Sequence, residues 1–319
     1  MQRTRQISFW MVNLVYLIIL LGLVFIPLLI QWMGVRADTT SAQLVQTVIL
    51  EIAIIGLPAF LFLWFGSDDR KAAFKLKPLP VLDILLVGGM AVTGYGFIIF
   101  VNLVWYAILS LMGEPTGQEV PAITTGNEFV LAIAALCIVP ALCEEMFFRG
   151  LMLNAYERRL RWVPAVVMVG TMFALYHILL ITIPSIIILG IMITFVVYRT
   201  RSIWAGVLYH FIHNFLSVCI AYAQPKLMEY MEGSGMPAEM PQLEGNLLMS
   251  GIIAWGVIGA FCLALFGVFT WLLHYRTRDI VRPTAVIEKP SVVEWVPAVL
   301  AGGLIIYLWV AQIIQMVNG

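Results

Sequence analysis

Long apolar stretches recur from one end of this 319-residue chain to the other, and each is long enough to cross about 30 Å of membrane hydrocarbon. Only 11% of the residues are charged and 62% are hydrophobic, whereas charged residues make up about 25% of an ordinary soluble domain. In lipid, a helix satisfies its own backbone hydrogen bonds. The sequence therefore predicts an all-α, polytopic transmembrane helical bundle.

The apolar runs give nine candidate spans, at residues 9–33, 43–65, 81–112, 129–156, 163–181, 185–198, 203–223, 247–274 and 295–317. The sixth run is short, so we expect eight full spans and one partial span. The first run is too long for the apolar core of a cleavable signal peptide and is interpreted as a span. The loop at 224–246 is expected to be irregular, because it contains Pro225, Gly233, Gly235, Pro237 and Pro241.

The positive charges fall in alternate loops, which predicts the orientation because Lys and Arg stay on the cytoplasmic side of short loops. These residues are Arg3, Arg5, Arg70, Lys71, Lys75, Lys77, Arg158, Arg159, Arg161, Arg199, Arg201, Arg276, Arg278, Arg282 and Lys289. We therefore expect a cytoplasmic N-terminus. No organelle address is visible, which favours a prokaryotic plasma membrane. The net charge of zero gives no indication of a nucleic-acid partner.

Five ionisable groups and one amide cluster within three of the predicted spans, where an ionisable group is costly and is a functional candidate by default. They are Glu144, Glu145 and Arg149 in the fourth span, His177 in the fifth, and His210 and Asn214 in the seventh. With a rise of about 1.5 Å per residue, most of them lie roughly 20–24 Å from the nearest cytoplasmic charge, and His210 about 14 Å. Three helices thus place polar groups at similar depth, which predicts a shared polar chamber.

The two glutamates of the fourth span have different neighbours. Glu145 and Arg149 are four residues apart, so they share a helical face and can form an ion pair. Glu144 points about 100° away and is the freer carboxylate, suited to act as a general base. Pro140 removes a helical hydrogen bond, so we expect a kink close to Glu144.

The polar side chains of the other two helices complete a set suited to peptide hydrolysis. His177 and His210 can exchange protons near neutral pH, and the amide of Asn214 can donate to a developing oxyanion. Cys143 adjoins Glu144, but no serine or cysteine forms an evident triad with these histidines. A blander interpretation remains open, in which both histidines bond backbone carbonyls and Glu145 with Arg149 only locks the helix.

The order and spacing of these residues resemble the CAAX protease and bacteriocin-processing family of intramembrane peptidases. The family pattern combines Glu-Glu-x-x-x-Arg, Phe-x-x-x-His and His-x-x-x-Asn. The matching residues are Glu144, Glu145 and Arg149, then Phe173 and His177, then His210 and Asn214. The resemblance divides the chain into N-terminal spans (1–128), a protease-like core (129–223), and an outer loop with the C-terminal spans (224–319).

The resemblance implies an endopeptidase that cleaves a peptide or membrane-protein substrate within the bilayer. Its implied catalytic residues are Glu144, His177, His210 and Asn214, supported by Glu145, Arg149 and Phe173. A Zn²⁺ ion held by Glu144, His177 and His210 stays open, because three such ligands and a water suffice. The chain lacks the HExxH motif, and a metal-independent glutamate mechanism is favoured.

Two other classes of function fit the same residues. A proton-coupled transporter would use Glu51, a second-span acid without an evident partner, together with Glu144 and His177 as a relay. The absence of an apparent inverted repeat disfavours this hypothesis. A non-catalytic membrane regulator would keep the same fold and bind partners without chemistry.

Overall fold

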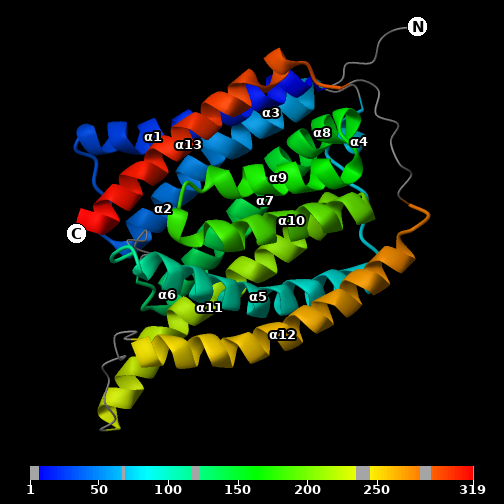
Figure 1. The fold of residues 1–319 in the computed structure, drawn as a ribbon. Coiled ribbons are helices and arrows are strands. Elements are labelled where there is room, and N and C mark those ends of the chain that lie inside the picture. Colours follow the sequence, from blue (N-terminus) through cyan, green and yellow to red (C-terminus); the bar gives the residue numbers. More distant parts are fainter. Residues whose placement is uncertain (1–6, 67–68, 116–121, 235–244, 281–288, 319) are drawn as a thin grey trace, which may run out of the picture.

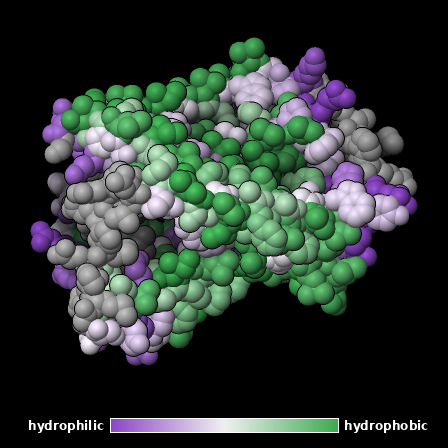
Figure 2. Space-filling view, turned by 60° about the horizontal axis from the view of Figure 1, so that its bottom comes forward, coloured by the Kyte–Doolittle hydropathy of each residue, from purple (hydrophilic) through white to green (hydrophobic). Residues whose placement is uncertain are grey.

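The computed structural model describes residues 7–66, 69–115, 122–234, 245–280 and 289–318, and all the regular elements in them are helices (Figure 1). Within these ranges, eight helical segments are long and apolar enough to cross a membrane. Apolar side chains cover much of the molecular surface between its ends, where hydrophilic side chains gather (Figure 2). The chain is therefore an integral, multi-pass, all-α membrane protein, as the sequence predicts.

The helices follow in order along the chain. They are α1 (Phe9–Trp32); α2 (Thr40–Glu51), η1 (Ile52–Gly56) and α3 (Leu57–Gly66), which form one segment; α4 (Arg70–Ala73); α5 (Val81–Ser110); α6 (Gly126–Ala132), η2 (Ile133–Ile138), α7 (Val139–Glu145), η3 (Met146–Met152) and α8 (Leu153–Arg159), which form another; α9 (Trp162–Tyr176); η4 (Leu180–Thr182) and α10 (Ile183–Thr200); α11 (Ile203–Gly233); α12 (Gly245–Arg276); and α13 (Val292–Asn318). Three short elements, η1, η2 and η3, are π-helical, and η4 is a 3₁₀ turn.

The partial span is the fifth, not the sixth as the run lengths suggest. Helix α9 has 15 residues and ends at Tyr176, whereas α10 has 18 and extends the turn η4. The chain leaves the helix at His177, and Ile178 adopts a left-handed conformation with φ of 62°. The apolar run continues through this break, so hydropathy could not locate it.

The break after α9 exposes backbone groups that lipid cannot satisfy, and polar side chains from neighbouring helices bond them. Trp309 Nε1 and Gln312 Nε2 donate to the Ile178 carbonyl at 2.9 and 3.0 Å. The Leu180 N–H donates to Gln312 Oε1 at 3.0 Å, and Trp105 Nε1 donates to the Leu180 carbonyl at 2.8 Å. These bonds from α5 and α13 fix the position where His177 leaves α9.

Helix α11 is longer than expected, because it continues through Pro225 to Gly233. The segment after this proline consists largely of Lys, Leu, Met and Glu, which favour helix and outweigh one lost hydrogen bond. The expectation of an irregular loop at 224–246 is therefore wrong for 224–233. Residues 235–244 lie outside the described part of the chain.

The charged residues that set the predicted orientation gather at one end of the bundle. Glu157 forms ion pairs with Arg201 and with Lys75, whose Nζ lies 3.7 Å from Glu157 Oε1. Arg159 pairs with Glu294 at 3.0 Å. The ends of α4, α8, α10 and α13 therefore meet on one side (Figure 1). Which side faces the cytoplasm stays a prediction, and Arg3, Arg5 and Arg282 lie outside the described residues.

Candidate active site

The acidic segment, residues 133–152 of the fourth span, alternates between α- and π-helix. Pro140 lies in the first turn of α7 and has no N–H, so it cannot donate to the Leu136 carbonyl four residues earlier. The helix accommodates this with the π-helical element η2, an irregularity that is frequent at functional sites. Asn214 Nδ2, from α11, donates to the Leu136 carbonyl at 2.8 Å. The expected disturbance at Pro140 thus takes the form of a π-helical segment bonded by a site residue.

Arg149 and Glu145 form the predicted ion pair, and neither side chain is exposed. Arg149 Nη1 donates to Glu145 Oε1 at 2.6 Å. The other guanidinium nitrogens reach α10, where Nη2 donates to the Gly190 carbonyl at 3.0 Å and Nε to Thr194 Oγ1 at 3.3 Å. One guanidinium therefore joins the acidic segment to α10 and satisfies a buried charge with hydrogen bonds on both sides.

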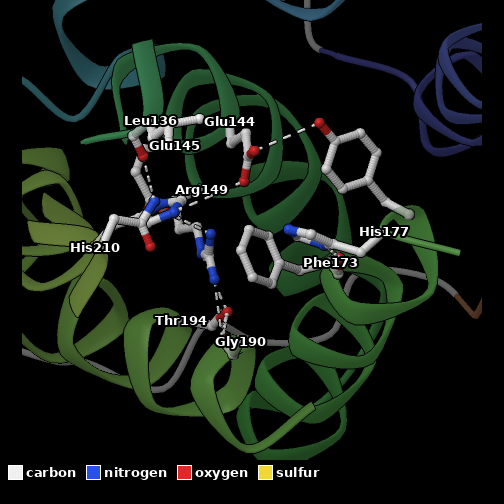
Figure 3. A network of polar contacts seen from close by, with 11 residues as sticks. Leu136, Glu144, Glu145, Arg149, Phe173, His177, Gly190, Thr194 and His210 are labelled. Carbon is white, nitrogen blue, oxygen red and sulfur yellow. Dashed lines mark hydrogen bonds and ion pairs between the residues drawn. The ribbon is translucent and has the colours of Figure 1, made fainter. Parts of the chain in front are cut away.

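Phe173 lies between the two histidines of the site (Figure 3). Its ring centroid is 4.9 Å from that of His177 and 5.6 Å from that of His210, in both cases with edge-on geometry. The Arg149 guanidinium carbon lies 4.5 Å from the centre of the same ring, a cation–π contact. The Phe-x-x-x-His motif thus contributes an aromatic wall that both imidazoles and the guanidinium contact.

His210 is buried and faces both glutamates. Its Nδ1 lies 3.1 Å from Glu145 Oε1, and its Nε2 lies 3.9 Å from Glu144 Oε2. A carboxylate accepts hydrogen bonds, so Nδ1 carries the hydrogen that points to Glu145, and a neutral His210 presents a lone pair on Nε2. A Cβ at Gly206, one turn earlier on α11, would collide with the Glu145 carboxylate, so glycine permits this close approach.

Glu144 is 4% exposed and is held at one oxygen only. The Tyr176 hydroxyl donates to Glu144 Oε1 at 3.4 Å, and Oε2, on the side of His210, has no hydrogen-bond partner among the described residues. An acceptor left free beside a histidine nitrogen is the arrangement that a general base needs before water binds. Glu144 is therefore the freer carboxylate, as its helical position predicts.

His177 is the residue that ends α9, and its ring is oriented by its own helix. Nδ1 lies 2.9 Å from the Phe173 carbonyl, which can only accept, so Nδ1 carries a hydrogen. The neutral ring then presents Nε2 as an acceptor. The bland interpretation of a histidine that bonds a backbone carbonyl is therefore met at Nδ1.

The side-chain amide of Asn214, predicted from the sequence to donate to an oxyanion, donates to a backbone carbonyl in the structure. The amide nitrogen carries two hydrogens, and the bond to Leu136 uses one of them. Its assignment as an oxyanion donor stays a prediction, now with a second role in closing the π-helical segment.

Sequence reasoning missed Tyr176, and it associated Glu51 with Glu144 only in the transporter hypothesis. Tyr176 is an aromatic residue in an apolar helix and has no signal that separates it from core packing. Glu51 is, in the sequence, only a buried acid without an evident partner, whereas the structure places its carboxylate beside the Tyr176 hydroxyl and near Glu144. The signal for Glu51 is its charge within a span, but its partners depend on how two distant helices pack.

The candidate zinc ligands do not gather into a three-ligand metal site among the described residues. Glu144 Oε2 and His210 Nε2 lie close enough for two ligands of one ion. Across the described ranges, however, no group of three or more His, Cys, Asp or Glu side chains is arranged to hold a metal.

Residues 126–216 match the model of a protein family described as type II CAAX prenyl endopeptidase Rce1-like. The matched segment begins at α6 and ends within α11, so it contains the acidic segment, Phe173, both histidines and Asn214. No curated protein and no solved structure matches the chain.

Proposed function

We propose, from the match of residues 126–216 to the Rce1-like family of type II CAAX prenyl endopeptidases, that this chain hydrolyses peptide bonds within the membrane by a glutamate-dependent mechanism. The supporting observation is the free oxygen of Glu144 opposite Nε2 of His210. Substrates would be peptides or membrane proteins that reach the site through the bilayer or from its charged end. A prokaryotic plasma membrane stays the proposed location.

The catalytic water would lie between Glu144 and His210. A separation of 3.9 Å between Oε2 and Nε2 lets one water molecule contact both atoms at about 2.8 Å each. Glu144 takes a proton from this water as its oxygen attacks the carbonyl carbon of the substrate. Glu145 holds the Nδ1–H of His210 and so fixes which nitrogen faces the water.

The remaining residues serve the later stages of the reaction. The attack places negative charge on the carbonyl oxygen, and the second amide hydrogen of Asn214 can donate to it. The proton that Glu144 gained passes to the leaving amine, and His177 Nε2 can bind that amine or relay the proton. Arg149 has no direct part in this chemistry, because its guanidinium is committed to Glu145 and α10.

A comparison of peptide termini in cell membranes tests this proposal even while the substrate is unidentified. The chain is expressed as wild type and as Glu144→Gln, which keeps the shape of the side chain, with the exposed Glu229→Gln as a matched control. New termini that accumulate with wild type and Glu229→Gln should fall by at least about 100-fold with Glu144→Gln, the usual contribution of a general base.

Identical termini for wild type and Glu144→Gln, at equal amounts of inserted protein, would reject the proposal. The regulator and transporter hypotheses would then be preferred. Uptake of a solute into vesicles that requires Glu144 would distinguish the transporter.

A further inference from the structure

Glu51 is a buried acid that the proposed chemistry does not use. It is the last residue of α2, within a membrane span, and its exposed fraction is 9%. Its Oε1 has no hydrogen-bond partner in the part of the chain that the structure describes. A carboxyl group at this depth is costly for a helix that must insert into lipid. Its location therefore requires an explanation from the groups around it.

The segment after Glu51 is pressed against the helix that carries Glu144. The π-helical element η1 follows directly, and a Cβ at Gly56 would lie 2.6 Å from Cys143 Sγ. Only a residue without a side chain permits this approach. Because Cys143 adjoins Glu144, the close contact brings the carboxyl end of α2 to the rear of the proposed site.

Tyr176 is the group that both carboxylates share. Its hydroxyl donates to Glu144 Oε1 at 3.4 Å, near the long limit for a hydrogen bond, and also faces the Glu51 carboxylate. The Tyr176 ring is held by edge-on contacts with Phe148 and His177, at 5.5 and 4.8 Å between centroids. The hydroxyl donates its one hydrogen to Glu144, so its oxygen is left to accept from a protonated Glu51 carboxyl group.

We propose that Glu51 is a positioning residue of the proteolytic site, which orients Glu144 through the Tyr176 hydroxyl. The inference rests on the proposed function and extends the site from the matched segment to α2. A protonated carboxyl group at position 51 donates to the Tyr176 oxygen and holds the hydroxyl between the two acidic side chains. This keeps Glu144 Oε1 directed to Tyr176 and leaves Oε2 directed to His210.

A double-mutant cycle tests this link, with the accumulation rate of Glu144-dependent membrane termini as the readout. Glu51→Met removes the donor at similar length, Glu51→Gln keeps an N–H donor without an ionisable group, and Tyr176→Phe removes the shared hydroxyl. Thr47→Val is the control on the same helix, since the Thr47 hydroxyl bonds to the Gln43 carbonyl of α2 itself. Rates are normalised to inserted protein, and melting temperatures are compared.

Misplaced catalytic groups cost up to about 100-fold in rate, and we expect Glu51→Met to lose on the order of tenfold. Glu51→Gln should stay within about threefold of wild type, because its amide N–H can still donate to the Tyr176 oxygen. In the Tyr176→Phe background, Glu51→Met should have little further effect, since the route to Glu144 is already lost. Thr47→Val should match wild type.

The outcomes separate this inference from the proposed function. If no terminus depends on Glu144, the proposed function fails and the inference fails with it. If termini depend on Glu144 but Glu51→Met cleaves at the wild-type rate, only the inference is overturned. The inference would also be overturned if Glu51→Met lowered the cleavage rate by the same factor in the wild-type and Tyr176→Phe backgrounds. Such additive losses would mean that Glu51 acts independently of the Tyr176 hydroxyl, as a purely structural acid would.

Discussion

Replacement of Arg149 by Met should destabilise the protein through the charge left at Glu145. Both side chains are fully buried and their atoms lie 2.6 Å apart, and removal of one partner from such a pair typically costs about 3–5 kcal/mol. The lost bond to Gly190 adds little, because Thr194 Oγ1 also donates to that carbonyl at 2.6 Å. We therefore expect the free energy of unfolding to fall by about 3–5 kcal/mol.

A second substitution identifies the source of that loss. Glu145→Gln in the Arg149→Met background removes the unpaired charge and keeps an oxygen that accepts from His210 Nδ1. The double variant should regain at least about 2 kcal/mol, since replacing both members of a buried pair is often neutral. Unfolding of each variant is measured by titration with a denaturing detergent in mild micelles. An Arg149→Met loss below about 1 kcal/mol, or a double variant less stable than the single one, would show that the unpaired charge is not the cause.

Two further predictions concern packing and pH. Gly206→Ala should lower the free energy of unfolding by about 1–3 kcal/mol, because its methyl group meets the Glu145 carboxylate. Gly251→Ala, which has open space around it, should not destabilise the protein. Equal melting temperatures for the two variants would contradict the close approach at Gly206. Burial lowers the pKa of Lys75 to about 8, against the opposing effect of Glu157. Between pH 8 and about 10.4 the unfolded chain therefore binds more protons at Lys75 than the folded protein does. The free energy of unfolding should rise with pH across that window, by up to about 3 kcal/mol. The difference between wild type and Lys75→Met in melting curves at successive pH values measures this rise, and a constant difference would contradict it.

The local features of the site could be predicted because they depend on spacing within one helix. The Glu145–Arg149 pair follows from a separation of four residues, and the freedom of Glu144 follows from its place one residue earlier. The similar depth of three polar helices follows from counting residues. Each of these inferences uses helix geometry alone, so the sequence was sufficient.

The features that failed depend on contacts between distant segments. Hydropathy could not place the end of α9, because Trp309 and Gln312 of α13 make an open backbone tolerable within an apolar run. The bond from Asn214 to Leu136 requires a π-helical segment that no periodicity reveals. The sequence does not reveal a partner for Glu51, because Tyr176 lies far along the chain. The two residues meet only when α2 packs against α7.

Activation of the hydrolytic water by Glu144 can be measured with purified protein in lipid vesicles. The substrate is a fluorogenic peptide that spans a cleavage site identified from the membrane termini. We expect Glu144→Gln to lower kcat/KM by at least about 100-fold while Cys143→Ser stays within a few-fold of wild type. Cleavage by Glu144→Gln at the wild-type rate, or loss of cleavage in Cys143→Ser with an intact fold, would contradict a glutamate-activated water.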